Sequence, residues 1–462
     1  MPESSEPRLA LFGARLYTTA EIQFAEPKPV RPTGSYSLLL VFLCLLYTNL
    51  TLLVPSLDDV RPVQLVGMCA LLLLFVELTL SRRGIYMLWP ESHLFLAFLG
   101  AAVLSCFTAL WMRLAVISAA DLAKMAAIYF VMVNSIDTET RLRGVIWTMI
   151  LGGLAPAVGT IRNHLNGVLI EGTRAAWIGI FGNPNEVAYA LVVLVPLVFL
   201  LGTTSSRRLR LLAWAVLPVF ATAIYLSFSR GGLIGLAAVL VLIGLRQRSR
   251  FLSIFVWVLL IGGVFLTAHF WSREEGFTGV SQDLTFQQRI ATIQAGLQMF
   301  LDYPLLGVGI GCSVVGWPLY APENLYTRGS LVNHNTFVQA LSETGVLGFI
   351  PFALLLISSL NHTRKMARTC AEMGKEPSVR LATALEISLL GFLVCGMSGG
   401  YLLTWFPYLL FGLTSCAARL TALDTEAAGE SRSPGEEGYD GIDVSDRSHA
   451  AEQEAASRPA GD

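Results

Sequence analysis

Residues 184–202 read PNEVAYALVVLVPLVFLLG, an almost unbroken apolar run. A helix needs about 20 mostly apolar residues to cross the hydrocarbon core of a bilayer, so this stretch predicts a transmembrane helix. The whole chain has the same character, because 54% of its 462 residues are hydrophobic, 14% are charged, and its mean hydropathy is +0.60. A soluble domain is usually about one quarter charged, so the composition predicts a membrane protein.

Twelve segments share this apolar character and predict an all-α polytopic membrane protein with about twelve transmembrane helices. They are residues 36–55, 62–80, 93–111, 117–135, 144–162, 184–202, 210–228, 231–246, 251–270, 344–361, 381–399 and 402–420. Arg and Lys gather in every second connection, as at Arg82 and Arg83 after the second segment. Because short cytoplasmic loops are enriched in these residues, we expect both termini in the cytoplasm.

Two connections on the opposite side, residues 162–183 and 271–343, are too long to be simple turns. The tail after residue 420 is rich in Glu, Asp, Ser, Gly and Ala, which is typical of disorder. The predicted organisation has five parts: a cytoplasmic segment 1–35, nine transmembrane helices in 36–270, an extracytoplasmic loop with short helices at 271–343, three further helices in 344–420, and a disordered cytoplasmic tail 421–462.

Net charge and cysteine usage exclude several classes of partner. The net charge of −1 gives no basic field, so no nucleic-acid partner is expected. The seven cysteines have no paired spacing and lie mostly in apolar runs, where cysteine acts as a small hydrophobic residue. We therefore expect neither a disulfide framework nor a metal site, and no cofactor.

Two arginines lie on the predicted outer side. Arg230 stands in Ser-Arg-Gly-Gly where the seventh segment leaves the bilayer, and the glycines let the backbone approach a ligand closely. Arg289 lies in Thr285-Phe-Gln-Gln-Arg-Ile, a stretch of the long loop that opens an amphipathic helix running through about Leu301. One face of that helix carries Ile290, Ile293, Leu297 and Phe300. Guanidinium groups grip phosphate oxygens through two hydrogen bonds each, so we expect both arginines in the site.

Four further outer residues are candidates for substrate binding, and each has a structural alternative. Asn183 and Asn185 lie at the start of the sixth segment, where they can instead cap that helix. Arg174 can equally be an ordinary surface charge. Lys124 is an ionisable residue within a span, which favours function, although Asp121 one turn earlier can simply neutralise it.

His334 is the histidine placed among several polar residues, in Asn333-His334-Asn335 at the end of the long loop. A helical stretch that carries Glu343 follows it. The pKa of histidine lies near neutrality, so His334 can take a proton from an attacking sugar hydroxyl. A diphosphate leaving group gains most from cationic stabilisation. These residues together predict glycosyl transfer from a polyprenyl diphosphate donor, with Asn333, Asn335 and Glu343 contacting substrate.

The stretch Asp302–Gly311 has glycines at alternate positions, as a phosphate-binding loop does, but no lysine follows it. A closely packed loop against the membrane surface is the alternative. This stretch and residues 333–345, together with Gly-Asn-Pro-Asn at 182–185 and Ser-Arg-Gly-Gly at 229–232, resemble the O-antigen ligase/polymerase family. The resemblance covers about residues 180–360.

The resemblance implies a metal-independent, inverting glycosyltransferase of type-C-like architecture in the bacterial inner membrane, with a periplasmic active site. Such proteins move glycan from undecaprenyl diphosphate to lipid A core, to a growing polysaccharide or to protein, and can work within a polysaccharide-assembly complex. The family's outer arginines correspond to Arg230 and Arg289, and its loop histidine corresponds to His334.

Two other functions remain open from the residues alone. A transporter or flippase for an anion or a lipid-linked sugar would use the same helical scaffold. Transporters tend to carry charges near the bilayer midplane and repeated halves, and the chain shows few such charges and no internal repeat. A scaffold subunit of an export complex would need only the cytoplasmic tail, which leaves the outer polar residues without a role.

Overall fold

The structure is a computed structural model that describes residues 33–54, 60–247, 249–270, 284–322 and 330–430. In this part of the chain the regular structure is helical, apart from one isolated bridge between Ile170 and Arg174. The first half contains α1 (Gly34–Thr48), α2 (Leu50–Leu53), α4 (Pro62–Leu80), α5 (Glu91–Ser105), η1 (Cys106–Thr108), α6 (Met112–Ser135), α7 (Glu139–Leu165), η2 (Gly179–Phe181), α8 (Pro184–Thr204) and α9 (Arg207–Leu226). The second half contains α10 (Arg230–Arg246), α11 (Arg250–Phe270), α12 (Leu284–Asp302), α13 (Ser313–Tyr320), α14 (Thr336–Glu372), α15 (Glu376–Gly396) and α16 (Trp405–Glu430).

A helix lies at each of the twelve segments predicted to cross the membrane. Among the described residues, nine of these helices are long and apolar enough for a span. The all-α polytopic class is therefore confirmed, while the number of spans stays a prediction. Most helix ends differ from the prediction by a few residues, and α14 is longer at both ends than the predicted segment 344–361. Two differences have a clear consequence. α1 ends at Thr48 because Asn49 adopts the left-handed conformation (φ 48°), and α16 continues to Glu430, into the segment predicted to be a disordered tail.

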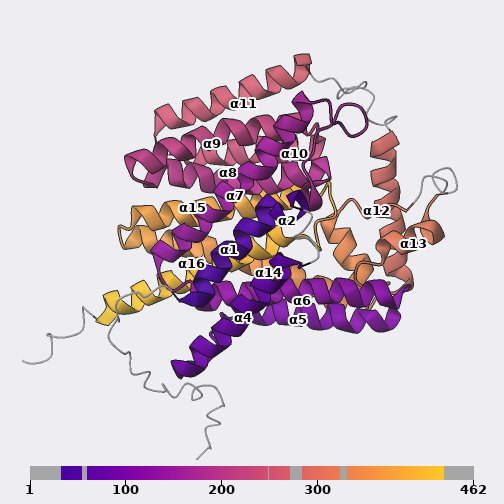
Figure 1. The fold of residues 1–462 in the computed structure, drawn as a ribbon, viewed down its shortest axis with the longest axis horizontal. Coiled ribbons are helices and arrows are strands. Elements are labelled where there is room, and N and C mark those ends of the chain that lie inside the picture. Colours follow the sequence, from indigo (N-terminus) through magenta and orange to yellow (C-terminus); the bar gives the residue numbers. More distant parts are fainter. Residues whose placement is uncertain (1–32, 55–59, 248, 271–283, 323–329, 431–462) are drawn as a thin grey trace, which may run out of the picture.

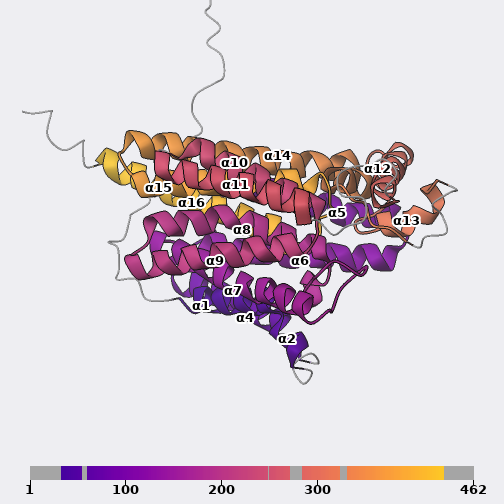
Figure 2. The same ribbon diagram turned by 90° about the horizontal axis from the view of Figure 1, so that it is seen from above.

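The stretch quoted first forms the centre of the bundle. α8 packs against α7, α9, α10 and α15. Of its most apolar 18-residue stretch, 89% is buried inside the protein. The most apolar 18-residue stretch of α4 is only 11% buried, so that helix turns most of its apolar surface outward. A helix that is apolar on all sides is suited to full burial, which α8 achieves. Figure 2 shows the long helices lying roughly side by side around it.

One end of the bundle carries α12 and α13, beside the ends of α5 and α6 (Figure 1). We call it the loop end. The Thr108 hydroxyl after α5 donates to the Gly307 carbonyl oxygen at 2.7 Å. α12 confirms the helix predicted from Thr285. Its buried residues include Ala291, Thr292, Ala295 and Met299, whereas Ile290 and Leu297 of the predicted apolar face are 41% and 42% exposed.

The glycine-rich stretch after α12 packs against the backbone of α14. The Val308 N–H donates to the Ser342 carbonyl oxygen and the Val346 N–H donates to the Pro304 carbonyl oxygen, both at 2.9 Å. α14 is kinked at Gly345, which has φ 60° and ψ −165°. A Cβ atom at Gly307 would meet the backbone of Glu343 and Thr344. The glycines thus permit contact between two protein backbones, and the position of the stretch relative to the membrane surface stays a prediction.

Candidate functional site

Asn185 joins three segments at the loop end. Arg174, which is 6% exposed, donates from Nη2 to the Asn185 Oδ1 atom at 2.7 Å and from Nε to the Ser227 carbonyl oxygen at 3.3 Å. The Ser229 hydroxyl donates to the same Oδ1 atom at 2.8 Å. One carboxamide oxygen therefore ties the connection after α7 to the starts of α8 and α10. Arg174 is a buried part of this junction rather than an ordinary surface charge.

Two side chains cap the helices that begin here. Asn183 is the N-cap of α8 and its side chain accepts from the Asn185 N–H at 2.9 Å, as the structural alternative predicted. Ser229 is the N-cap of α10 and accepts from the Gly232 N–H at 3.2 Å. Arg230 is the first residue of α10 and is half-buried. Its cation therefore lies at a helix N-terminus, where the backbone also favours anions.

The segment around His334 is fixed on both sides. Asn335 caps α14 by accepting from the Phe337 and Val338 N–H groups at 2.9 and 3.1 Å. Asn333 is 3% exposed and donates to the Thr292 carbonyl oxygen of α12 at 3.2 Å. The neighbours of His334 thus anchor the backbone to α12 and α14. These hydrogen bonds indicate positioning roles for Asn333 and Asn335, and their contact with substrate stays a prediction.

Electrostatics places His334 beside two arginines. Burial lowers the pKa of His334, and the positive charges of Arg289 and then Arg174 lower it further, to about 4. The imidazole is therefore neutral at pH 7, ready to accept a proton. Arg289 lies one turn before Thr292 on α12, and Arg174 comes from the connection between α7 and α8. Two arginines far apart in sequence thus lie close enough to His334 for their charges to act on its imidazole, and we call the three residues the cluster around His334.

Tyr401 belongs to the same cluster and was not predicted. Its hydroxyl donates to the Asn185 carbonyl oxygen at 3.4 Å, and its ring stacks on Tyr189 with centroids 4.0 Å apart. Burial raises the pKa of Tyr401, and the charges of Arg289 and Arg174 act in the opposite direction. The available sequence signal was Ser398-Gly399-Gly400, a non-helical break between two apolar segments. That break also brings Ser398 against Gly231 at the start of α10.

Lys124 forms an ion pair with Asp121 at 2.7 Å, and both side chains are 47% exposed. This is the i, i+3 pair that the sequence offered as the structural alternative. No hydrogen bond among the described residues links Lys124 to the cluster around His334. Its contact with substrate stays a prediction.

Glu343 lies beneath the glycine-rich stretch and is 1% exposed. Its carboxylate accepts from the Gly311 N–H at 2.8 Å, from the Ser313 hydroxyl at 2.6 Å, and from the Gln339 amide at 3.3 and 3.4 Å. Each of these partners is a donor group of the protein itself. These contacts indicate a structural role in fixing the glycine-rich stretch, while the predicted substrate contact stays untested.

The Glu343→Gln substitution is expected to destabilise the protein by about 1–3 kcal/mol. An amide NH₂ would replace one acceptor oxygen and would face the donors of Gly311 and Ser313. Thermal unfolding of the purified protein in detergent measures the change. Glu372→Gln, at the exposed end of α14, is the matched control and should leave the midpoint unchanged. Equal midpoints for Glu343→Gln and the wild type would contradict the structural role.

Within the described residues, no group of three or more His, Cys, Asp or Glu side chains lies close enough to hold a metal ion. The family model of O-antigen ligase matches residues 213–353, which confirms the resemblance seen in the sequence. The matched region includes Arg230, Arg289 and His334, and it excludes Arg174 and Asn185. No curated protein matches the chain.

Proposed function

Since residues 213–353 match the O-antigen ligase family, we propose that this chain transfers a glycan from a polyprenyl diphosphate donor to a glycan, lipid or protein acceptor. The observation that carries the proposal is the convergence of Arg174 and Arg289 on the neutral imidazole of His334. The family match supports ligase- or polymerase-type chemistry in general. The donor, the acceptor and the side of the membrane are parts of the proposal.

In the proposed reaction the arginines bind the diphosphate and His334 accepts the proton. Guanidinium groups match phosphate oxygens, and a cationic site stabilises the diphosphate as the sugar–phosphate bond breaks. The acceptor hydroxyl attacks the anomeric carbon from the opposite side, so the configuration inverts. Its proton passes to an imidazole nitrogen of His334. Arg230 adds a third cation at the start of α10, and no metal is required.

The proposed orientation puts the loop end in the periplasm of a bacterial inner membrane. The excess of Arg and Lys in alternate connections supports it, because those connections then face the cytoplasm. The polyprenyl tail would remain between the helices while the sugar enters from the aqueous side. This arrangement corresponds to the type-C-like architecture. Lys124 and Arg174 are proposed to contact the substrate within it.

Donor binding should raise the pKa of His334, because the negative diphosphate offsets the field of Arg289 and Arg174. Protonation removes the base, so activity falls on the acidic side. The acidic limb of kcat/KM, which reports the free enzyme, is expected near pH 4, and the limb of kcat is expected at a higher pH. Arg174→Gln removes one positive charge and should move the kcat/KM limb to higher pH.

Two measurements check this pH dependence: the pH–rate profiles and titration of His334 by NMR of isotope-labelled histidine in the unliganded protein. His164→Gln, in the last turn of α7, removes a different histidine at the loop end and should leave the profiles unchanged. A kcat/KM limb that stays in place or moves to lower pH in Arg174→Gln would contradict the assigned cluster.

The proposed function is tested with the purified protein in nanodiscs and a synthetic polyprenyl diphosphate oligosaccharide. Transfer to a foreign acceptor identifies a ligase, and lengthening of the donor glycan identifies a polymerase. The protein should work in the presence of a chelator. Movement of the donor across liposomes without formation of a new glycosidic bond would replace the enzyme with a flippase.

A further inference from the structure

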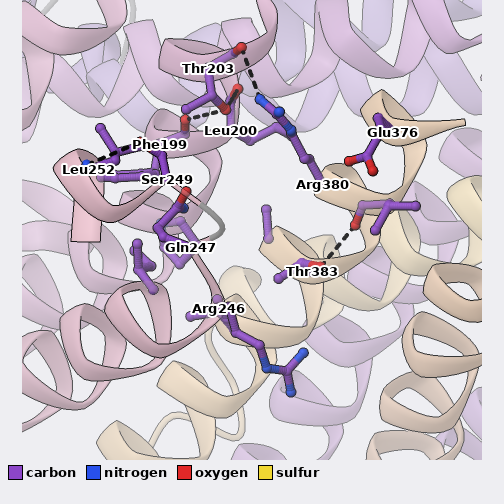
Figure 3. Close-up of a pocket in the computed structure, with 15 residues that line it drawn as sticks. Phe199, Leu200, Thr203, Arg246, Gln247, Ser249, Leu252, Glu376, Arg380 and Thr383 are labelled. Carbon is purple, nitrogen blue, oxygen red and sulfur yellow. Dashed lines mark hydrogen bonds between the residues drawn. The ribbon is translucent and has the colours of Figure 1, made fainter. Parts of the chain in front are cut away.

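A cavity of about 170 Å³ lies at the opposite end of α8 from Asn185 and the residues around His334. Figure 3 shows the side chains that line it. Four helices contribute to it: the end of α8, the end of α10, the start of α11 and the first turns of α15. Arg174 and His334 lie by the starts of α8 and α14 instead. The cavity-lining residues of α8 run from Pro196 to Thr203, so they lie about 17–27 Å along the helix from Asn185. The cavity is therefore distinct from the proposed active site.

The lining of the cavity has two chemical parts. Phe199, Leu200 and Leu252 contribute to an apolar part. Ser249, Thr383 and Arg380 contribute to a polar part. Figure 3 shows Arg380 beside Thr203, with Arg246 on the opposite side of the cavity. Apolar and cationic walls in one cavity suit a ligand that carries both an anionic group and a hydrocarbon group.

Positive charge is in excess around the cavity. Glu386, which is 1% exposed, accepts from Arg246 at 2.9 and 3.3 Å and from Arg364 at 2.8 Å. One buried carboxylate is thus shared by two guanidinium groups. Of the lining itself, Arg380 adds a third guanidinium to this group of charges and Glu376 adds a second carboxylate, whereas Glu386 and Arg364 lie outside the lining. Three arginines against two glutamates favour an anion.

Arg380 is the side chain best placed to hold that anion. It is exposed, and it donates one long hydrogen bond of 3.4 Å to the Thr203 carbonyl oxygen. A guanidinium has five N–H donors, so Arg380 can keep this contact and still bind a phosphate oxygen. The hydroxyl groups of Ser249 and Thr383 lie in the same lining.

We propose that this cavity binds one anionic phospholipid of the surrounding leaflet, with its phosphate at Arg380 and an acyl chain against Phe199 and Leu252. The neighbouring surface supports a lipid rather than a soluble anion. Leu245, Phe251 and Ile254 on α10 and α11 are 68%, 82% and 62% exposed, as expected for residues that face acyl chains. Basic pockets between helices at the cytoplasmic leaflet suit anionic head groups, and the predicted orientation puts the cavity there.

The bound lipid would attach α11 to the bundle. α11 makes its extensive contacts with α10. The cavity is lined by Leu252 of α11, Phe199 of α8 and Arg380 of α15, so its occupant touches all three helices. A ligand that binds only the folded protein raises its stability, and here the gain should depend on the lipid head group. This role is independent of glycosyl transfer.

The test compares lipids and a charge variant in delipidated protein in detergent. Native mass spectrometry counts retained phosphatidylglycerol, and thermal unfolding follows its effect on the midpoint. Wild-type protein should retain one phosphatidylglycerol and gain stability from it. Arg380→Gln should weaken retention about tenfold, as expected for the loss of one charge-assisted hydrogen bond. Arg368→Gln, an exposed arginine of α14 outside the cavity lining, is the matched control and should behave as wild type.

Three outcomes would overturn the proposal. Inorganic phosphate that stabilises as well as phosphatidylglycerol would show an anion site without a lipid. Phosphatidylcholine retained as strongly would show that head-group charge is irrelevant. Equal retention by Arg380→Gln and wild type would remove Arg380 from the site. Arg380 is exposed and makes one long hydrogen bond, so the variant should fold.

Discussion

Replacement of Arg289 with alanine is expected to reduce glycosyl transfer by about 10²–10³-fold, the range seen when one donor that stabilises a developing negative charge is removed. Arg289 lies on α12, close enough to His334 to lower its pKa. Its loss would remove both a phosphate ligand and part of that field. Arg289→Lys should recover little activity, because an ammonium group cannot make the paired hydrogen bonds of a guanidinium. Initial rates with a synthetic lipid-linked donor measure both variants.

Arg162→Ala is the matched control for Arg289→Ala. Arg162 lies in the last turn of α7, is exposed, and belongs to the same end of the bundle. Its removal should leave the rate within about twofold of wild type, since a solvated surface charge contributes little. A stable Arg289→Ala protein that transfers glycan at the wild-type rate would rule out the proposed site. Equal losses in both variants would point to a general effect of surface charge.

Gly345→Ala is expected to destabilise the protein by about 2–6 kcal/mol, the combined cost of backbone strain and overpacking. Gly345 has φ 60° and ψ −165°, a region that is essentially restricted to glycine. A Cβ atom there would also meet the backbone of Leu305 and Leu306. The hydrogen bond from the Val346 N–H to the Pro304 carbonyl oxygen would break as the segments separate. Thermal unfolding in detergent measures the loss.

Gly100→Ala separates this local cause from a general intolerance of substitution. Gly100 lies within α5, and a Cβ atom there would meet nothing within 4 Å. Alanine is a better helix former than glycine, so the control should be neutral or slightly stabilising. A Gly345→Ala protein that unfolds at the wild-type midpoint would show that the junction between the glycine-rich stretch and α14 can relax.

The helices of the bundle could be predicted from sequence because their signal is local. An apolar run such as 184–202 predicts a transmembrane helix from its own residues, whatever segments surround it. The start of α14 could be anticipated for the same reason, since Asn335 caps the helix that follows it directly. The orientation of α12 could not, because Ile290 and Leu297 are exposed while the smaller Ala291 and Ala295 are buried. Which face of α12 is buried depends on the helices that it packs against.

The candidate site could be predicted from the sequence only in part. Arg289 and His334 stand out as polar residues next to apolar segments, and the structure brings them together. The burial of Arg174 depends on Asn185 and on the Ser227 carbonyl oxygen, which lies 53 residues away in sequence. Tyr401 belongs to the non-helical break between α15 and α16. Hydropathy alone places the two predicted transmembrane segments there almost directly one after the other. Such contacts are set by tertiary packing, and no single segment reports them.

The central position of α8 also constrains the order in which the chain is assembled. Membrane helices are inserted before they pack, and α8 leaves the ribosome before α9, α10 and α15, three of the helices that cover it. During translation α8 must therefore be stable when lipid alone surrounds it, and afterwards it must be stable when other helices surround it. A helix with one polar face would fail the first requirement. The run at 187–202, which is apolar on all sides, satisfies both.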